Sequence, residues 1–229
     1  MMKETMETAA TTTPIGSKRD YLFGTLSGLA IGVLLMPILK TAKPDLYLSL
    51  RFVVIPVFTV LVPLGLVIAS RISRFLPVIW QLSKFIVIGV LNALVDIGTL
   101  SFMLYLASAS SYPIASGDTL FVLFVPVAFF TLYKSISFLI ANMNSYFWNK
   151  HWTFEVNHDK KTSTEFIQFF VISFVGFIIN VVASSLVFHV LHNTSGMSND
   201  QWAIVGAVTG SFAGLAWNFI GYKYFVFKK

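Results

Sequence analysis

Long apolar runs alternate with short polar segments along almost the whole chain. Six runs are close to the roughly 20 residues that a helix needs to cross a hydrocarbon core about 30 Å thick. Backbone polar groups in lipid must be hydrogen-bonded within their own segment, so such runs are expected to be helical. We place the runs at about 21–39, 52–70, 85–106, 130–149, 166–191 and 202–222. The pattern predicts an all-α integral membrane protein with six transmembrane helices.

The fourth run follows another apolar stretch, Leu120–Phe129. This stretch is open to three interpretations: it begins a long helix, it re-enters the membrane, or it lies at the interface. Pro126 would break a helix here, and Lys134 follows soon after. We therefore favour a short re-entrant piece.

The distribution of Lys and Arg predicts the orientation. Twelve of these residues lie in the segments expected inside the cell, and three lie in the outer loops, namely Lys40, Lys43 and Arg51. Short cytoplasmic loops are enriched in positive charge. We expect a multi-pass protein of the plasma (inner) membrane with both termini in the cytoplasm, and residues 1–20 are expected to be a disordered cytoplasmic tail.

Composition supports the membrane assignment and excludes several functions. Of the 229 residues, 11% are charged, whereas soluble domains carry about a quarter. The net charge of +6 is spread over loops, so nucleic-acid binding is not expected. The chain has no cysteine and no HExxH histidine pair, so we predict no disulfide, metal site or cofactor.

The first two runs form an N-terminal hairpin, 21–70, joined to the rest by an expected interfacial linker, 71–84. Gly24, Gly28 and Gly32 recur every fourth position and lie on one face of the first helix. Such a stripe of small residues is typical of closely packed helices.

The remaining chain contains an internal repeat. The segment KFIVIGVLNALVD from Lys84 aligns with QFFVISFVGFIIN from Gln168, an offset of 84 residues. The segment SYFWNKHWTF from Ser145 aligns with NFIGYKYFVF from Asn218, an offset of 73 residues. The first repeat therefore has a longer outer loop.

Each repeat contains two helices and returns to the side where it began, so the two are parallel repeats. They cover about 85–154 and 166–227, within a four-helix domain at 85–229. The predicted fold is thus an N-terminal hairpin followed by two parallel-repeat helical hairpins.

The repeat carries recognisable motifs at its helix ends. The opening motif is Phe85, Gly89, Asn92 and Asp96; the closing copies are Tyr146, Asn149, Lys150, Trp152, Phe154 and Asn218, Phe219, Lys223, Phe225, Phe227. Over about residues 81–229 these motifs resemble those of the GtrA-like family of small bacterial membrane proteins. Ser145, Gly176 and Tyr222 depart from the family pattern, in which asparagine occupies these positions.

The resemblance implies a role in cell-surface polysaccharide synthesis or teichoic acid glycosylation. It implies that the chain translocates sugars linked to polyprenyl phosphate, or that it anchors a glycosyltransferase. The N-terminal hairpin lies outside the unit that the resemblance covers.

Polar residues inside the expected spans are the first candidates for a site, because an ionisable group in hydrocarbon is costly. Asp96 lies eleven residues into its run, roughly 16 Å deep, with Asn92 and Thr99 on the same face. Asn180 occupies the position of Asp96 in the second repeat. For Asp96 we favour headgroup binding, and for the asparagines interhelical hydrogen bonds worth about 0.6–2 kcal/mol each.

Lysines mark the two ends of the expected fourth helix. Lys134 lies sixteen residues before Lys150, roughly 24 Å along a helix axis. Phosphate capture near each leaflet is one interpretation, and snorkelling of Lys134 to the outer headgroups is the other.

Lys150 and Lys223 occupy the same position in the two repeats. The aromatic residues beside them are Trp148, Trp152, Tyr222 and Phe225. Aromatic residues with basic neighbours are ordinary interface anchors. The alternative is that the lysines bind a lipid phosphate, which suits a lysine as a point charge.

We find no catalytic constellation and predict that the chain is not an enzyme. The leading hypothesis is a translocator for polyprenyl-phosphate-linked sugars, surrounded by membrane lipids. Its candidate headgroup-binding residues are Asn92, Asp96, Lys134, Asn149, Lys150, Asn180, Asn218 and Lys223. A glycosyltransferase adaptor and a small-molecule or ion transporter are the alternatives. Four core helices enclose little space, so a homodimer is compatible with either transport hypothesis.

Overall fold

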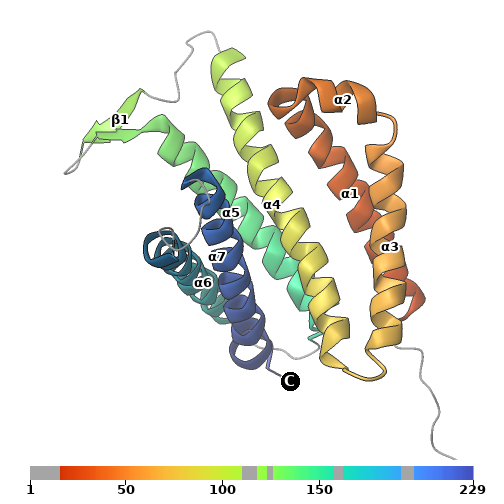
Figure 1. Cartoon of the computed structure of the whole chain (residues 1–229). Helices are drawn as coiled ribbons and strands as arrows, with labels where there is room; N and C mark the ends of the chain where they lie inside the picture. The colour runs from red at the N-terminus through yellow and green to blue at the C-terminus, as the bar shows by residue number, and fades with distance from the viewer. Residues whose placement is uncertain (1–15, 110–117, 123–125, 157–161, 192–198, 229) are drawn as a thin grey trace, which may run out of the picture. The chain divides into compact units, whose positions relative to one another are not determined.

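The computed structural model describes residues 16–109, 118–122, 126–156, 162–191 and 199–228. The described residues form two compact units, one ending at Trp148 and one beginning at Asn149 (Figure 1). In the first unit the elements are α1 (Lys18–Ala42), α2 (Pro44–Leu50), α3 (Val54–Ile72), α4 (Val78–Ala109), β1 (Thr119–Val122), β2 (Pro126–Ala128) and α5 (Phe129–Trp148). In the second they are the π-helical turn η1 (Asn149–Thr153), α6 (Thr162–Leu191), α7 (Asn199–Gly221) and the π-helical turn η2 (Tyr222–Val226).

Helices occupy all six positions at which apolar runs were predicted, so the helical prediction is confirmed. Among the described residues, four helices are long and apolar enough to cross a membrane: Lys18–Lys40, Val54–Ile72, Val78–Ala109 and Ser163–Val187. Over their described residues, helices α5 and α7 do not combine the required length with the required apolar character. The count of six spans and the repeat layout stay predictions.

The N-terminal hairpin is closely packed, as its glycine stripe predicts. At Gly28 an added Cβ would lie closer than 3.0 Å to the Phe58 carbonyl oxygen of α3. At Gly32 it would lie 2.8 Å from the Ile55 Cα. Only glycine lets the two backbones approach this closely, which confirms the packing role of the stripe.

Helix α4 is longer than its apolar run because it begins at Val78. Most of the segment expected as an interfacial linker, 71–84, is therefore helical, and residues 73–77 form the turn between α3 and α4. Pro77 precedes the first helical residue, where its fixed φ favours helix initiation. The earlier start brings Lys84 into α4, where its Nζ lies 3.2 Å from Asp20 Oδ1 of α1.

The stretch before α5 is a short antiparallel hairpin, in which Phe121 pairs with Val127 and Val122 with Pro126. The helix begins only at Phe129, whose N–H donates to the Asp118 carbonyl oxygen at 2.9 Å. The interpretation that Leu120–Phe129 begins a long helix is therefore wrong. Pro126 cannot donate a helical hydrogen bond, and it is tolerated at the end of a strand.

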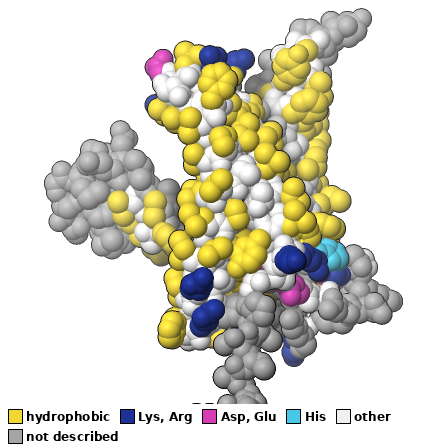
Figure 2. Space-filling model, turned by 90° about the vertical axis from the view of Figure 1, so that its right-hand side faces the viewer, with side chains coloured by type: hydrophobic (Ala, Val, Ile, Leu, Met, Phe, Trp, Pro, Cys, Tyr) yellow, Lys and Arg dark blue, Asp and Glu magenta, His cyan; other side chains and the backbone are white. Residues whose placement is uncertain are grey.

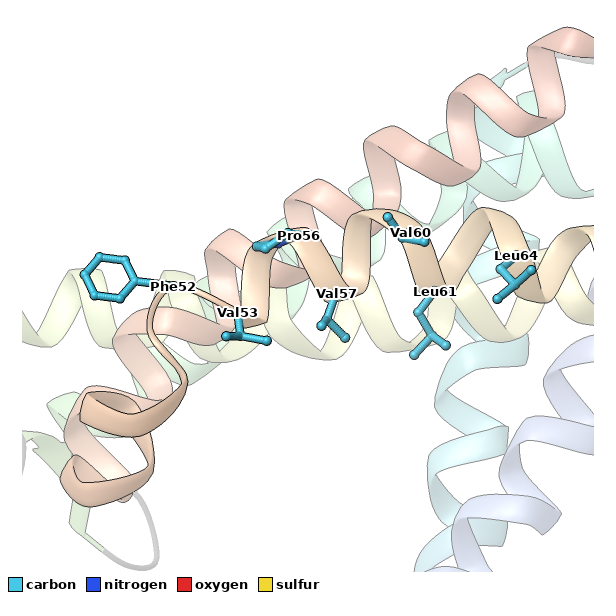
Figure 3. Close-up of a pocket in the computed structure, with 7 residues that line it drawn as sticks. All are labelled: Phe52, Val53, Pro56, Val57, Val60, Leu61 and Leu64. Atoms are coloured by element: carbon cyan, nitrogen blue, oxygen red, sulfur yellow. The ribbon is translucent and has the colours of Figure 1, made fainter.

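Apolar side chains cover the outer surface of α1 and α3, with Lys and Arg gathered toward the ends of the apolar zone (Figure 2). Helix α3 also has a shallow apolar hollow of about 500 Å³, drawn in Figure 3. Its lining residues are Phe52, Val53, Pro56, Val57, Val60, Leu61 and Leu64. All are apolar, as lipid contact requires.

In the second unit, α6 and α7 pack through a glycine stripe on α7. An added Cβ would lie 2.7 Å from the Ser184 carbonyl oxygen at Gly206 and 2.9 Å from the Gly176 carbonyl oxygen at Gly214. At Gly210 it would lie closer than 3.0 Å to the Asn180 carbonyl oxygen. The two helices are thus in backbone contact over about two turns.

Candidate functional site

An ionic cluster joins α4 and α5 in the first unit. Asp96 lies in the middle of α4, and Lys134 and Ser137 lie one turn apart near the start of α5. Lys134 Nζ forms an ion pair with Asp96 Oδ2, and Ser137 Oγ donates to Asp96 Oδ1 over 2.7 Å. The structure therefore brings together two predicted site residues, Asp96 and Lys134.

The cluster is accessible from the surface of the hairpin. The side chains of Lys134 and Asp96 are 43% and 21% exposed, whereas Ser137 is fully buried. Ser137 therefore holds the carboxylate from the inside while the ammonium group faces outward. Charged groups at this depth of a span are costly unless paired, and here the two charges cancel.

The equivalent place in the second unit is neutral and packed. Asn180 replaces Asp96 and Gly210 replaces Ser137, and the aligned partner of Lys134 is Ala207. Asn180 Oδ1 accepts a hydrogen bond from Ser184 on its own helix at 3.4 Å. The cation and carboxylate therefore belong to the first hairpin alone.

Each hairpin has one asparagine at these aligned positions, on its first helix in the first repeat and on its second helix in the second repeat. In the first repeat, Asn92 lies on α4 and the aligned closing residue is Ser145; in the second, Gly176 lies on α6 and Asn218 closes α7. A Cβ added at Gly176 would clash with Asn218 Oδ1, so this asparagine fills the space that glycine leaves. Within the described part of the chain, Asn92 Oδ1 and Asn218 Oδ1 are buried without a hydrogen-bond partner. A buried carbonyl oxygen of this kind is available to a donor such as a water or a hydroxyl.

Both closing motifs end in the same backbone conformation. The Phe154 N–H donates to the Asn149 carbonyl oxygen at 2.9 Å, and the Phe227 N–H donates to the Tyr222 carbonyl oxygen at 2.7 Å. Both bonds span five residues, which is the π-helical pattern, and π-turns occur frequently at functional sites. The aligned motifs thus share a local structure as well as a sequence.

The two π-turns meet in an aromatic core within the second unit. The rings of Phe154 and Phe227, which are equivalent residues of the two repeats, stack with centroids 5.2 Å apart. Phe169 stacks on Tyr222 at 4.1 Å, and the Tyr222 hydroxyl shares a 2.6 Å hydrogen bond with Ser173. These contacts fix the closing end of the second repeat against the end of the first.

The two repeat lysines have different surroundings. Lys150 is buried and forms an ion pair with Glu165 at 2.7 Å, with side chains 11% and 0% exposed. Lys223 is half-buried, and its Nζ lies 5.7 Å from the Phe219 ring centre and 5.6 Å from that of Tyr224. Equivalent sequence positions therefore do not have equivalent electrostatics.

The remaining predicted site residues differ in burial. Asn149, Trp152 and Tyr222 are buried in the interior of the second unit, and Phe225 is 64% exposed. Trp148 packs edge-on against Phe23 with ring centres 5.4 Å apart. The described residues contain no group of His, Asp and Glu side chains that could hold a metal ion.

Three polar residues were missing from the sequence-based site. Ser137 follows Lys134 by three residues, which places both on one helix face, so this spacing could have indicated it. Glu165 and Asp20 gave no signal beyond being acidic residues near helix ends. Their partners, Lys150 and Lys84, are recognisable only from the packed structure.

Comparison with known proteins agrees with this architecture. Residues 84–227 match the family model described as "GtrA/DPMS, transmembrane domain". A relative in Bacillus subtilis (strain 168), the uncharacterized membrane protein YngA, is 29% identical over 148 residues, which are 64% of this chain and 78% of the relative. No solved structure matches the chain. Because the family model covers well over half of the sequence, the chain is a membrane protein of the GtrA/DPMS transmembrane-domain family.

Proposed function

We propose that the chain translocates polyprenyl-phosphate-linked sugars across the plasma membrane, with both of its termini in the cytoplasm. The family assignment supports a role in glycosylation at a membrane. The observation that supports translocation of a lipid-linked sugar is the accessible Asp96–Lys134 pair in the α4–α5 hairpin.

A sugar phosphate headgroup resists entry into hydrocarbon because it would lose its hydration there. Lys134 can replace that hydration with charge-assisted hydrogen bonds to the phosphate. When Lys134 turns to the phosphate, the Asp96 carboxylate, still held by Ser137, is free to accept hydrogen bonds from sugar hydroxyls. The isoprenoid tail remains in lipid throughout.

The ion pair also explains how the site exists without substrate. An unpaired charge costs free energy in proportion to its burial, and pairing with Asp96 offsets that cost for the Lys134 side chain, which is 43% exposed. The phosphate exchanges one anionic partner of Lys134 for another, so the ammonium group remains paired. This exchange involves no covalent chemistry, in line with the prediction that the chain is not an enzyme.

The test is transbilayer movement in liposomes containing the purified chain and a short-chain polyprenyl-phosphate hexose. We expect Asp96→Asn and Lys134→Gln to slow movement roughly ten- to one-hundredfold, because hydrogen bonds to charged groups are worth about 1.5–3 kcal/mol. The matched control is Ser108→Ala on the same helix, where the exposed hydroxyl bonds only to the Tyr105 carbonyl oxygen of its own turn. This control should move lipid at the wild-type rate.

Two outcomes would replace the proposal. Movement no faster than in protein-free vesicles, together with a glycosyltransferase that co-purifies from cells, would make the chain an adaptor. Transport of a free sugar or ion that needs no lipid tail would make it a small-molecule transporter.

A further inference from the structure

The surroundings of Lys223 differ from those of an ordinary surface lysine. Its ammonium group lies between two aromatic rings, those of Phe219 and Tyr224. Among the residues that the structure describes, no carboxylate lies within ion-pair distance of it. Aromatic faces attract a cation but do not use its N–H donors in strong hydrogen bonds, so those donors remain available to an anion.

The equivalent lysine is already neutralised. Glu165 lies 2.7 Å from Lys150, and its side chain is completely buried. An incoming phosphate would have to displace this carboxylate or approach it, and like charges at that distance repel strongly in a buried site. Lys150 is therefore poorly suited to binding an anionic ligand.

The acidic partner of Lys150 is not common to the two repeats. Glu165 precedes Gln168 by three residues, and the residue three before Lys84 in the first repeat is Gln81. The aligned position is therefore acidic in the second repeat and neutral in the first. Among the described residues, Lys150 therefore has a carboxylate partner and Lys223 has none.

We propose that Lys223, and not Lys150, binds the phosphate group of a lipid at the closing end of the second repeat. The inference rests on the proposed function in that it names where a lipid-borne phosphate binds outside the Asp96–Lys134 cluster. Two lipids carry such a phosphate: a polyprenyl phosphate and a bulk anionic phospholipid. Phe219 and Tyr224 flank the ammonium group and offer apolar contact to the adjoining lipid chain or sugar.

The experiment measures equilibrium binding of a radiolabelled short-chain polyprenyl phosphate to the full chain in neutral-lipid nanodiscs. Charge-assisted hydrogen bonds of about 1.5–3 kcal/mol predict that Lys223→Gln weakens binding at least about tenfold. Lys223→Arg should keep most of the affinity because it retains the charge. The matched control is Lys228→Gln, an exposed lysine five residues further on, which should bind as the wild type does.

Competition with phosphatidylglycerol distinguishes the two lipids. If it displaces polyprenyl phosphate at equal concentration, the site binds lipid phosphates in general; if it does not, the site is selective for the polyprenyl lipid. Unchanged binding in Lys223→Gln, or equal weakening in Lys223→Gln and Lys228→Gln, would overturn the proposal. Because binding is measured without transport, a chain that binds through Lys223 but moves no lipid would refute only the translocator function.

Discussion

The α4–α5 and α6–α7 hairpins have related sequences, but the first has an ionic cluster between its helices and the second has close backbone packing. In the α4–α5 hairpin, an aspartate, a lysine and a serine meet between the helices. In the α6–α7 hairpin, the aligned positions hold an asparagine, an alanine and a glycine, and the helices approach to backbone contact. The α4–α5 hairpin therefore has accessible charged side chains, whereas the α6–α7 hairpin is closely packed.

The same division occurs at the closing ends. Both motif copies form a π-turn, and their final phenylalanines stack on each other. Yet the lysine of the first copy is buried in an ion pair, whereas that of the second lies half-exposed between aromatic rings. The two aligned motifs therefore share a backbone conformation but differ in their charged contacts, so function cannot be transferred between them by alignment alone.

The largest stability effect should come from breaking the buried ion pair of the first copy. Glu165→Gln leaves the buried Lys150 ammonium without its carboxylate, which should cost about 3–5 kcal/mol. Lys223→Gln, at the lysine equivalent to Lys150, breaks no ion pair among the described residues and should cost far less. Denaturant titration in detergent micelles measures both, and equal losses would contradict the difference between the lysines.

A smaller loss of stability should follow from separating the packed helices α6 and α7. Gly210→Ala places a Cβ against the Asn180 carbonyl oxygen, which should destabilise the chain by about 1–3 kcal/mol. The control is Gly89→Ala on α4, where an added Cβ meets nothing within 4 Å. That change should be neutral or stabilise by up to about 1 kcal/mol, because alanine favours a helix. Thermal unfolding of the two variants in the same detergent checks the prediction, which fails if they shift together.

The smallest stability effect is expected in the polar hairpin. Asp96→Asn keeps an acceptor for Ser137 and leaves an ammonium group that is already 43% exposed, so the loss should stay below about 1 kcal/mol. Its unfolding midpoint should match that of Ser108→Ala within error. A loss as large as that of Glu165→Gln would make the Asp96–Lys134 pair a structural feature.

Much of the fold was predictable because membrane spans require long apolar runs and close helix packing requires small residues. The positions of the helices and the role of Gly28 in packing could be inferred this way. The early start of α4 was not predicted, because Arg71, Arg74 and Pro77 interrupt the apolar pattern just before Val78, where the helix begins.

The site was predictable in part. Asp96 and Lys134 were singled out as charges within apolar runs, but 38 residues separate them, and spacing along each helix does not say which faces meet. The pairing of Lys150 with Glu165 was hidden for the same reason, because it depends on the packing of η1 against the start of α6.

The most direct test replaces the charged residues of the α4–α5 hairpin with the neutral residues found at the aligned positions of the α6–α7 hairpin. The double variant Asp96→Asn/Lys134→Ala carries the residue types found at Asn180 and Ala207, and it leaves no unpaired charge. We predict that this variant folds normally and that its initial rate of polyprenyl-phosphate-hexose movement in liposomes falls at least about tenfold. A folded double variant that moves the lipid at the wild-type rate would contradict the assignment of the headgroup path to the Asp96–Lys134 cluster.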